Sequence, residues 1–382
     1  MDEPLLMAWS SENSLSNTTI MGIMRILDDF LREKRKKAVS EKWKRELTSS
    51  YKNLKTHRRL TKEQKKEIQE FYKSVIGREI DLYSHEYFYS RTGLYSKYYV
   101  PTNLHQVELL GRANMLPYTN AYGDKNMTDV FLKGVRQPHT FLKNINGYYY
   151  VEGKPVTEEQ AVEQCSQLKN MLIKPTLFSR GKGIQALEVT DGITNIDGMT
   201  VGELFRQYKK NFQIQERLKQ HAQMSMLNPS SVNTIRIITF RSGMEILVIS
   251  VVVRIGRKGA VIDNQCAGGI SAVINEEGRL GKYGFGGFDQ DDILTTDTGT
   301  VLEGFQIPSF DKVVEKVKEL HFQLPFFDLI GWDMAVAEDG EPVLIEWNTR
   351  VGLSQSAYGP GFGKYTERIL RELWPRKNTR VF

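Results

Sequence analysis

Three oxygen-bearing side chains near the end of the chain form a pattern that can bind a metal ion. Asp333 lies in the apolar stretch 330–337, and Glu346 and Asn348 lie in the stretch 343–348. Two carboxylates on an apolar sheet repel each other and are costly to desolvate, so they need a compensating cation. Oxygens from Asp, Glu and Asn suit Mg²⁺, the ion that accompanies nucleotide phosphates. The alternative is a solvated strand face whose charges point outward.

The turn between the two stretches predicts how these side chains are placed. Asp339-Gly340 is a strong signal for a two-residue hairpin turn, because both positions accept a positive φ. With those two residues as the turn, counting back along the strands places Asp333 directly opposite Glu346. Asn348 then lies on the same face as Glu346, since side chains alternate along a strand. Its partner is Gly331, which leaves room for an ion.

A second candidate site lies between residues 171 and 189. Lys174 follows an apolar stretch, and the glycine-containing segment Ser179–Gly183 precedes the next one. A lysine within an apolar strand needs an anionic partner. The glycines let backbone N–H groups approach phosphates, while Arg180 and Lys182 add positive charge. The segment is not a P-loop, because no Ser or Thr follows Lys182 and the next residues are strand-like. Taken alone, it also fits a plain hairpin turn.

The composition is that of a globular protein with a basic N-terminal part. Of the 382 residues, 40% are hydrophobic and 26% are charged, which suits two or three packed subdomains. The net charge is +6, yet residues 25–73 alone hold 17 Lys and Arg against 8 Asp and Glu. The remainder of the chain is therefore slightly acidic, and we expect no nucleic acid as a partner of the main body.

The sequence also lacks the patterns of a membrane-spanning or secreted protein. The longest apolar run, residues 246–253, is much shorter than the roughly 20 residues that a spanning helix needs. Residues 1–17 lack a basic start followed by an apolar stretch. Cys165 and Cys266 are too few for a disulfide framework. We expect a cytoplasmic location.

The hydrophobic patterns predict an α+β chain in four parts. Apolar residues at helical spacing over 20–31 and a capping-box pattern at Thr61–Gln64 predict helices near the N-terminus. Strand-like and helix-like stretches alternate beyond residue 150. The predicted parts are a basic helical extension at 1–75, an N-terminal subdomain at 76–150, a central subdomain with a glycine-rich flap at 151–214 and a C-terminal subdomain with the metal hairpin at 215–382.

The basic N-terminal helices leave two interpretations open. A basic amphipathic segment can dock on an acidic membrane surface such as the inner face of the membrane, on nucleic acid, or on a protein partner. A Lys-rich helix can also cover part of a hydrophobic core with its apolar face while its lysines point into solvent.

The order of these motifs resembles the sugar-transfer-associated ATP-grasp family, which is found with polysaccharide biosynthesis genes. The segments that carry the resemblance are residues 124–129, 173–184, 228–237, 263–270 and 331–348. The resemblance implies an ATP-grasp fold, in which two α+β subdomains clamp ATP. It also implies ATP and Mg²⁺ as cofactors, with Asp333, Glu346 and Asn348 as the metal ligands.

By that resemblance, one set of residues contacts ATP and another contacts the acceptor. Lys174 contacts the α and β phosphates, Arg236 neutralises phosphate charge during transfer, and Asn233 supports Arg236. Lys133, four residues after Asp129, stands nearest to the family's earlier lysine. The ATP-binding residues so implied are Lys133, Lys174, Arg180, Gly181, Lys182, Gly183, Gln215, Glu216 and Leu218. The acceptor-pocket residues are Asn264, Gly268, Gly269 and Arg350. Arg350 pairs either with a substrate carboxylate or with a neighbouring acidic residue.

The reaction implied is that of an ATP-dependent carboxylate–amine ligase. It proceeds through an acyl phosphate, on a glycan precursor or a related small molecule. Such a reaction is catalysed by positioning and charge neutralisation, which agrees with the lack of a Ser-His-Asp or Cys-His arrangement. Two alternatives stay open: an ATP-grasp kinase that phosphorylates a small molecule or sugar, and a non-enzymatic ATP-binding scaffold docked through its basic N-terminal helices.

Overall fold

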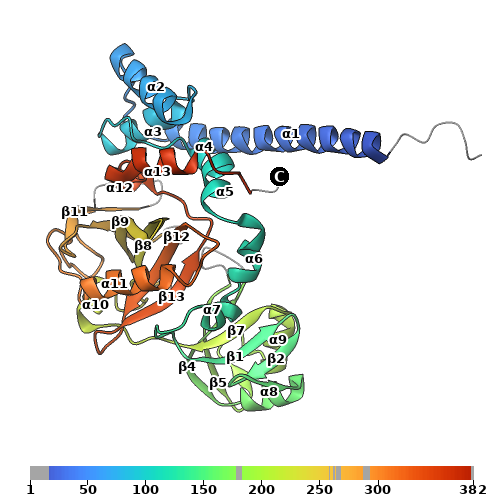
Figure 1. Ribbon diagram of the computed structural model, residues 1–382. Helices are drawn as coiled ribbons and strands as arrows, with labels where there is room; N and C mark the ends of the chain where they lie inside the picture. Colours follow the sequence, from blue (N-terminus) through green and yellow to red (C-terminus); the bar gives the residue numbers. More distant parts are fainter. Residues whose placement is uncertain are drawn as a thin grey trace, which may run out of the picture.

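The computed structural model describes residues 17–177, 183–257, 259–260, 263, 268–286 and 293–379. It contains helices and two antiparallel sheets, which confirms the predicted α+β class. In Figure 1 the two sheets lie one above the other beneath a helical layer, and α1 (Asn17–Lys52) reaches far out to one side. Within the described ranges, no helix is both long enough and apolar enough to cross a membrane.

The first sheet has seven strands in the order β3-β2-β1-β7-β4-β5-β6. Its strands are β1 (Thr140–Ile145), β2 (Tyr148–Val151), β3 (Lys154–Val156), β4 (Leu168–Pro175), β5 (Gln185–Thr190), β6 (Ile193–Thr194) and β7 (Phe212–Glu216). Helices α8 (Glu158–Gln164) and α9 (Val201–Tyr208) pack against it through Ala161, Leu204 and Phe205. Each of these helices begins with a capping box, which satisfies its first free N–H groups.

The second sheet has six strands in the order β11-β10-β9-β8-β12-β13. Its strands are β8 (Ile235–Ser242), β9 (Glu245–Ile255), β10 (Ile270–Ile274), β11 (Leu280–Phe285), β12 (Leu329–Val336) and β13 (Pro342–Asn348). Helix α11 (Phe310–His321) covers one face through Val313, Val317 and Leu320, which lie on one stripe of the helix. This packing forms the largest apolar core of the described residues.

Two further helices cover part of the opposite face of the second sheet. They are α2 (Lys62–Ile76) and α13 (Thr366–Leu373), which pack on Ile238 and Phe240 of β8. The capping box predicted at the start of α2 is present. Since alternate residues of a strand share a face, Arg236 lies on the same face of β8 as Ile238.

Short helices connect the N-terminal layer to the two sheets (Figure 1). Those before the first sheet are α3 (Tyr83–Thr92), α4 (Thr102–Leu104), the π-helix η1 (His105–Leu109), α5 (Leu110–Ala113), η2 (Leu116–Tyr118), α6 (Thr119–Tyr122), η3 (Lys125–Met127) and α7 (Thr128–Phe131). Those after it are α10 (Ala222–Leu227), α12 (Gln355–Tyr358) and η5 (Gly363–Tyr365). In Figure 1 the segment from α4 to α7 runs down beside the second sheet and reaches the first.

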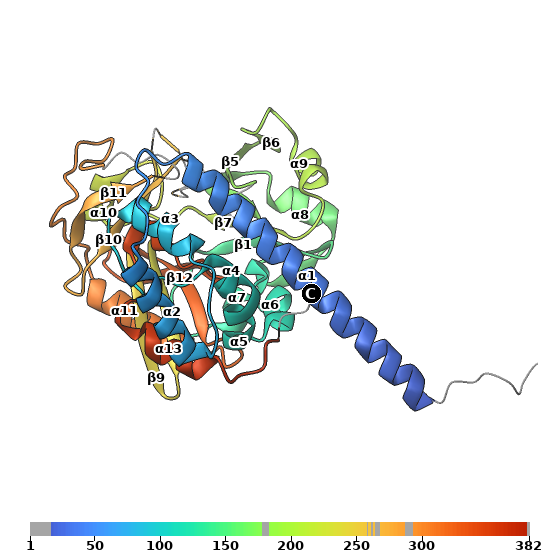
Figure 2. The ribbon, with the colours of Figure 1, turned by 90° about the horizontal axis from the view of Figure 1, so that it is seen from above.

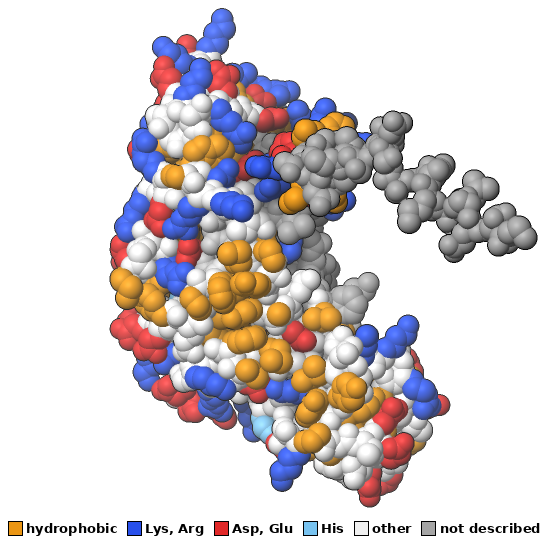
Figure 3. Space-filling view, turned by 45° about the vertical axis from the view of Figure 1, so that its right-hand side comes forward, with side chains coloured by type: hydrophobic (Ala, Val, Ile, Leu, Met, Phe, Trp, Pro, Cys, Tyr) orange, Lys and Arg blue, Asp and Glu red, His pale blue; other side chains and the backbone are white. Residues whose placement is uncertain are grey.

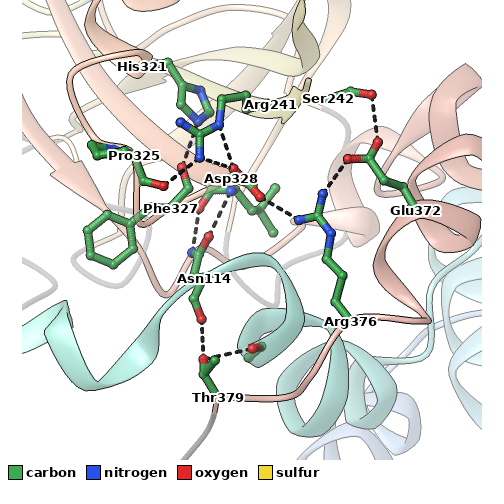
Figure 4. Close-up of polar contacts among 12 residues, drawn as sticks. Asn114, Arg241, Ser242, His321, Pro325, Phe327, Asp328, Glu372, Arg376 and Thr379 are labelled. Atoms are coloured by element: carbon green, nitrogen blue, oxygen red, sulfur yellow. Dashed lines mark hydrogen bonds and ion pairs between the residues drawn. The ribbon is translucent and has the colours of Figure 1, made fainter. Parts of the chain in front are cut away.

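A polar network ties the end of the chain to the second sheet (Figure 4). Asp328 lies between two guanidinium groups, with N–O distances of 2.5 Å to Arg241 of β8 and 2.6 Å to Arg376. Arg376 also pairs with Glu372 of α13 at 2.5 Å. Because Asp328 directly precedes β12, the network holds the segment that follows α13 against the β8–β12 pair.

Candidate active site

The predicted metal hairpin is present in the second sheet. Asp333 of β12 pairs with Glu346 of β13, and Gly331 pairs with Asn348, as the sequence predicted. Paired residues of antiparallel strands project to the same side, so the three proposed ligands share one face. Asp333 is 5% exposed, whereas Glu346 and Asn348 are half-buried.

The turn of this hairpin differs from the prediction. The N–H of Ala337 donates to the carbonyl of Glu341 at 2.9 Å, which leaves the three residues Glu338–Gly340 in the loop. Gly340 has a φ of 82°, the left-handed conformation that ends such a loop. The two-residue Asp-Gly turn is therefore wrong. A β-bulge next to Asp333 offsets the extra loop residue and restores the predicted pairing at the proposed ligands.

The carboxylate of Asp333 is held by two arginines. Arg236, its cross-strand partner on β8, donates from Nε to Oδ1 at 2.5 Å and from Nη2 to Oδ2 at 2.6 Å. Arg254 of β9 places Nη1 3.3 Å from the same Oδ1. Burial acts to raise the pKa of Asp333, but Arg236, Arg254 and Lys125 together hold the pKa below its ordinary value. Asp333 is therefore ionised and charge-compensated.

The space over Gly331 is filled by neighbouring side chains. A Cβ added to Gly331 would lie 2.7 Å from Cγ2 of Val351 and 3.4 Å from Nη1 of Arg236. The glycine therefore allows these two side chains to approach the strand closely. In this structure they occupy the room that the sequence assigned to an ion at Gly331.

Lys174 is buried at the end of β4 and points to a neutral partner. Its Nζ donates to Oε1 of Gln215 at 2.6 Å, and the amide nitrogen of Gln215 donates to Thr140 at 3.0 Å, which orients the amide. Burial, as the largest cause, and the nearby Lys125 lower the pKa of Lys174 while Glu346 opposes them, and together these effects bring the pKa to about 8. An ammonium whose bonded partner is an uncharged amide retains affinity for an anion.

Lys125 links the two sheets and was not among the residues assigned from the sequence. It begins η3, and its Nζ lies 3.5 Å from Oε1 of Glu346. The resemblance pointed instead to Lys133, which is exposed and donates from Nζ to the carbonyl oxygen of Asp129. Lys125 belongs to the Asp-Lys pair of the 124–129 motif, and that pair was the signal that could have identified it.

Six charged side chains therefore gather between the two sheets, and we call them the charged cluster. They are Lys125, Lys174, Arg236, Arg254, Asp333 and Glu346. Four are basic and two are acidic, so the cluster has an excess of positive charge near neutral pH. Such an excess, partly buried, favours the binding of a polyanion.

A backbone arrangement beside the charged cluster requires glycine. The carboxylate of Asp263 accepts bonds from the N–H of Thr234 at 2.9 Å and from the Thr234 hydroxyl, and burial raises the pKa of Asp263. A Cβ at Gly269 would lie 2.5 Å from the carbonyl oxygen of Asp263 and 2.9 Å from that of Ile255. Gly268 has a φ of 91°. The structure therefore explains both predicted glycines through backbone geometry.

The other residues assigned from the sequence are distributed as follows. Asn233 is buried, and its Nδ2 donates to the carbonyl oxygens of Met224 (2.9 Å) and Asn228 (2.8 Å), which closes the loop after α10. Glu216 and Arg350 are exposed. Arg180, Gly181, Lys182 and Asn264 lie outside the described residues.

The segment that follows the flap is tied to α9. Gly183 has a φ of 78°, and its carbonyl oxygen accepts a bond from the hydroxyl of Tyr208 at 2.7 Å. A Cβ at Gly183 would lie 3.0 Å from Cγ of Pro175 at the end of β4. The two ends of the flap are therefore close together, next to Lys174.

An apolar group adjoins the charged cluster on the same face of β12. Asp333 is followed on that face by Ala335 and then Ala337, since alternate residues share a face. Both alanines are buried and pack with Leu218, from the connection between the sheets, and with Ile345. Within two residues along this face of β12 the environment therefore changes from charged to apolar.

Comparisons with known proteins were made for sequence and for structure. The sequence profile described as "Sugar-transfer associated ATP-grasp" matches residues 105–370. Among curated proteins no significant match was found.

Several solved structures show a limited likeness to this chain. An L-amino acid ligase from Bacillus licheniformis is 14% identical with a TM-score of 0.39, over 70% of this chain and 51% of that one. A phosphoribosylamine–glycine ligase from Thermotoga maritima is 15% identical with a TM-score of 0.39, over 69% and 56%. A D-alanine–D-alanine ligase from Bacillus anthracis in complex with ATP is 14% identical with a TM-score of 0.37, over 66% and 65%. The chain thus spans 51–65% of the length of these structures.

Proposed function

This chain belongs to the sugar-transfer-associated ATP-grasp family, and on that basis we propose that it is an ATP-dependent carboxylate–amine ligase. Its two-sheet α+β architecture is the ATP-grasp fold that the sequence predicted. The observation that carries the proposal is the charged cluster, in which Lys174 is buried against a neutral amide and Lys125 joins the two sheets. An excess of partly buried positive charge at this place suits the phosphates of ATP.

The change from a charged to an apolar environment along β12 supports an orientation for ATP. We place the phosphates at the charged cluster and the adenine toward Ala335, Ala337 and Leu218. A purine ring prefers an apolar wall, whereas the triphosphate needs cations, so this orientation satisfies both ends of the molecule. Gln215 and Glu216, at the end of β7, lead directly into the segment that contains Leu218.

The oxygen donors on the hairpin fit a magnesium ion, provided that the basic side chains now paired with them are released. Asp333, Glu346 and Asn348 offer oxygens from one face, which is the chemistry that Mg²⁺ prefers. Both oxygens of Asp333 are bonded to Arg236, and Glu346 lies near Lys125, so these cations have to release the carboxylates first. When bound, the ion would neutralise phosphate charge and orient the phosphates.

We propose that ATP phosphates provide that release. Arg236 and Lys125 compensate the two carboxylates in the absence of ATP, and each can turn to a phosphate oxygen when ATP arrives. The carboxylates of Asp333 and Glu346 then become available to the ion. The charges of Arg236, Lys125, Asp333 and Glu346 thereby have opposite partners before and after ATP binds, which avoids the cost of unpaired buried charges.

The proposed reaction needs positioning and charge neutralisation from this chain. The substrate carboxylate attacks the γ-phosphorus of ATP, which gives an acyl phosphate and ADP; an amine then attacks the acyl carbon, and phosphate leaves as the amide forms. Lys174 and Arg236 hold phosphate oxygens while charge moves between them. Arg350 follows β13 and is exposed. It pairs with the substrate carboxylate or with a group next to that carboxylate.

The finer parts of the proposal concern substrate, place and organisation. We propose a glycan precursor or related small molecule as the carboxylate, because of the family's association with sugar transfer. We propose an intracellular site of action at the inner face of the membrane. Of the four proposed parts (1–75, 76–150, 151–214 and 215–382), the second and third contribute strands to one common sheet, and the last begins where β7 ends.

A hydroxylamine trap tests the proposed reaction. The full chain is incubated with ATP, Mg²⁺, hydroxylamine and a panel of carboxylates; a ligase forms a hydroxamate and free phosphate. Lys174→Met and Glu346→Gln are expected to lower the rate at least a hundredfold, in line with the loss of one charge-stabilising group. Lys154→Met and Glu338→Gln, at exposed positions on β3 and on the hairpin loop, are the matched controls.

The same experiment separates the alternatives. A phosphorylated acceptor formed with ADP, without free phosphate or hydroxamate, would identify a kinase and exclude the ligase. Binding of ATP without turnover of any carboxylate, unaffected by Glu346→Gln, would favour a scaffold. Neither outcome depends on the N-terminal helices.

A further inference from the structure

The projecting half of α1 exposes an unusual number of large apolar side chains. Figures 1 and 2 show this half extending beyond the rest of the molecule, and Figure 3 shows orange hydrophobic side chains on it. The exposed fractions are 71% for Met21, 63% for Met24, 71% for Ile26, 54% for Leu27, 63% for Phe30 and 37% for Leu31. Single exposed apolar residues are ordinary, but six within eleven residues of one helix form a patch.

The other half of α1 packs on the protein. Ser40 accepts a bond from Asn103 at 3.3 Å, and Arg32 donates to the carbonyl oxygen of Asn378 at 3.2 Å. Further along, Tyr51 and Leu54 are buried in an aromatic cluster with residues of α3. These contacts define the inner face of the helix, which is the face that points to the body.

Helical geometry places four of these six side chains, Met24, Leu27, Phe30 and Leu31, on the outer half of α1. At about 100° per residue, Leu31 lies about 180° from Ser40 around the helix axis, and Met24 lies about 160° from it. Leu27 lies about 160° from Trp43, which is half-buried beside the body. These four side chains therefore point away from the protein and are accessible to a flat surface, whereas Ile26 lies about 40° from Ser40 and Met21 about 20° from Arg32, toward the inner face.

The same outer face becomes basic further along the helix. Lys34 lies about 20° from Leu27, and Lys42 and Arg45 lie about 20° and 40° from Leu31. Glu41 also lies on this face, and Asp28 and Glu46 lie at its edge, each about 40° from Lys42. Lys42 pairs with Glu46 at 3.8 Å, and both side chains are exposed. An exposed ion pair of this kind is weak, so the Lys42 ammonium remains able to bind another anion.

We propose that the outer face of α1 docks on an anionic lipid surface. The apolar patch would enter the boundary between headgroups and acyl chains, while Lys34, Lys42 and Arg45 lie over acidic headgroups. A helix of 36 residues is about 54 Å long, so the patch and the basic part can touch one plane together. The body lies on the other side of the helix and does not obstruct the contact.

The charge along the outer face favours lipid over a second copy of the chain. The four outward side chains spread over about 120° of the helix circumference. Met24, Leu27 and Leu31 have the spacing of a two-stranded coiled-coil seam, but the next seam position is Lys34, whose charge is unfavourable in an apolar seam. A lipid interface accepts a wide apolar arc, and the basic continuation matches its charge.

Vesicle binding tests the proposal with the full chain. Co-sedimentation is measured with vesicles of phosphatidylcholine alone and with vesicles that contain phosphatidylserine. We expect binding to the anionic vesicles, weaker at high salt, and at least tenfold loss for the double variant Leu27→Asp, Phe30→Asp. Met244→Asp is the matched control, because Met244 is 87% exposed at the distant β8–β9 turn.

A second set of variants tests the basic part. Replacement of Lys34, Lys42 and Arg45 by Gln is expected to weaken binding to anionic vesicles roughly a hundredfold, at about fivefold for each charge. The control is Gln at the exposed Lys154, Lys282 and Lys318, which changes net charge equally. Absence of vesicle binding would overturn the proposal. Concentration-dependent dimers that Leu27→Asp, Phe30→Asp abolishes, without vesicle binding, would assign the patch to a second copy instead.

Discussion

Asp333 and Arg236 face each other across β12 and β8 and are joined by two side-by-side bonds of 2.5 Å and 2.6 Å. The acid proposed to hold the metal is thus bound to the arginine proposed to hold phosphate. This pairing makes the two roles interdependent, because removal of either residue takes from a partly buried charge its bidentate partner. ATP with Mg²⁺ carries both anionic phosphates and a cation. A phosphate can therefore pair with Arg236 and the ion with Asp333, so that neither side chain is left with its charge in an apolar environment.

Removal of Arg236 should destabilise the protein. Arg236→Met leaves the buried carboxylate of Asp333 with Arg254 at 3.3 Å as its nearest arginine. We expect the free energy of unfolding to fall by about 3 kcal/mol, as for other broken buried pairs. Urea denaturation followed by circular dichroism measures the change.

A double variant separates the pair from general damage. The additional change Asp333→Asn removes the uncompensated charge, so it should recover part of the loss caused by Arg236→Met. Arg206→Met, on the exposed side of α9, is the control and should have little effect. Equal denaturation midpoints for Arg236→Met and the wild type would contradict the role of the pair.

The affinity for ATP should decrease above pH 8. The pKa of Lys174 is lowered to about 8, so the free protein loses the ammonium charge above that pH. Bound phosphate favours the charged form and raises the pKa, so ATP has to restore the proton at high pH. The affinity should therefore fall, at most tenfold per pH unit, from pH 8 upward. Calorimetric titration with a non-hydrolysable ATP analogue measures it.

Lys174→Arg is the appropriate control for this pH dependence. An arginine stays charged throughout the range, so its profile should be flatter than that of the wild type, whatever the absolute affinity. If the wild type and Lys174→Arg showed the same slope between pH 7 and pH 9, titration of Lys174 would not be the cause.

His321 should make the stability depend on acid pH. It is buried between the hydroxyl of Thr239 (2.8 Å from Nδ1) and the carbonyl oxygen of Phe327 (3.0 Å from Nε2). Trp332 also donates to the Thr239 hydroxyl, so that hydroxyl donates to Nδ1 and Nε2 carries the proton. Burial lowers the pKa of this neutral imidazole from 6.5 to about 3.

The sign of the effect follows from proton binding. Between pH 6.5 and pH 3 the unfolded chain binds a proton at His321 and the folded chain does not, so stability falls as the pH decreases. The slope should exceed that of His321→Gln by up to about 1.4 kcal/mol per pH unit. Urea denaturation at pH 5, 6 and 7 measures both slopes. His139→Gln, which removes an exposed histidine, is the control variant.

A methyl group at Gly269 should disturb the backbone beside the charged cluster. In Gly269→Ala the new Cβ meets the carbonyl oxygens of Asp263 and Ile255, and backbone atoms cannot move aside as a flexible side chain can. We expect a loss of about 1–3 kcal/mol in stability, together with weaker ATP binding. Gly286→Ala is the control, since its Cβ would meet no atom within 4 Å. A stable Gly269→Ala with normal ATP binding would show that the backbone here adapts.

The hairpin shows how far sequence patterns reach. Apolar stretches and an Asp-Gly pair predicted two paired strands, with Asp333 opposite Glu346, and that pairing is confirmed. The loop nevertheless has three residues, and a bulge next to Asp333 makes up the difference. Loop length and bulge depend on how the hairpin packs against its neighbours, and local sequence carries little information about either.

The lysines show what the sequence left open. Spacing along the chain favoured Lys133, whereas the folded chain brings Lys125 to Glu346 across 221 residues of sequence. Lys174 was recognised because a lysine is costly in an apolar strand, a property of its immediate neighbours. Lys125 stands in a short polar segment where only the Asp-Lys pair marks it, and its place between the two sheets shows which lysine meets Glu346.

By itself, the sequence determined the α+β class, the family, the hairpin that carries Asp333 and Glu346, and the basic N-terminal helix. Each depends on neighbours within a strand, a helix or a turn, where periodicity and residue type carry the information. The tertiary structure alone decided that Arg236 and Arg254 hold Asp333, that Lys125 joins the sheets, and that the apolar side chains of the projecting half of α1 are exposed. These relationships join residues far apart in the chain, and their energies depend on burial that only the packed fold creates.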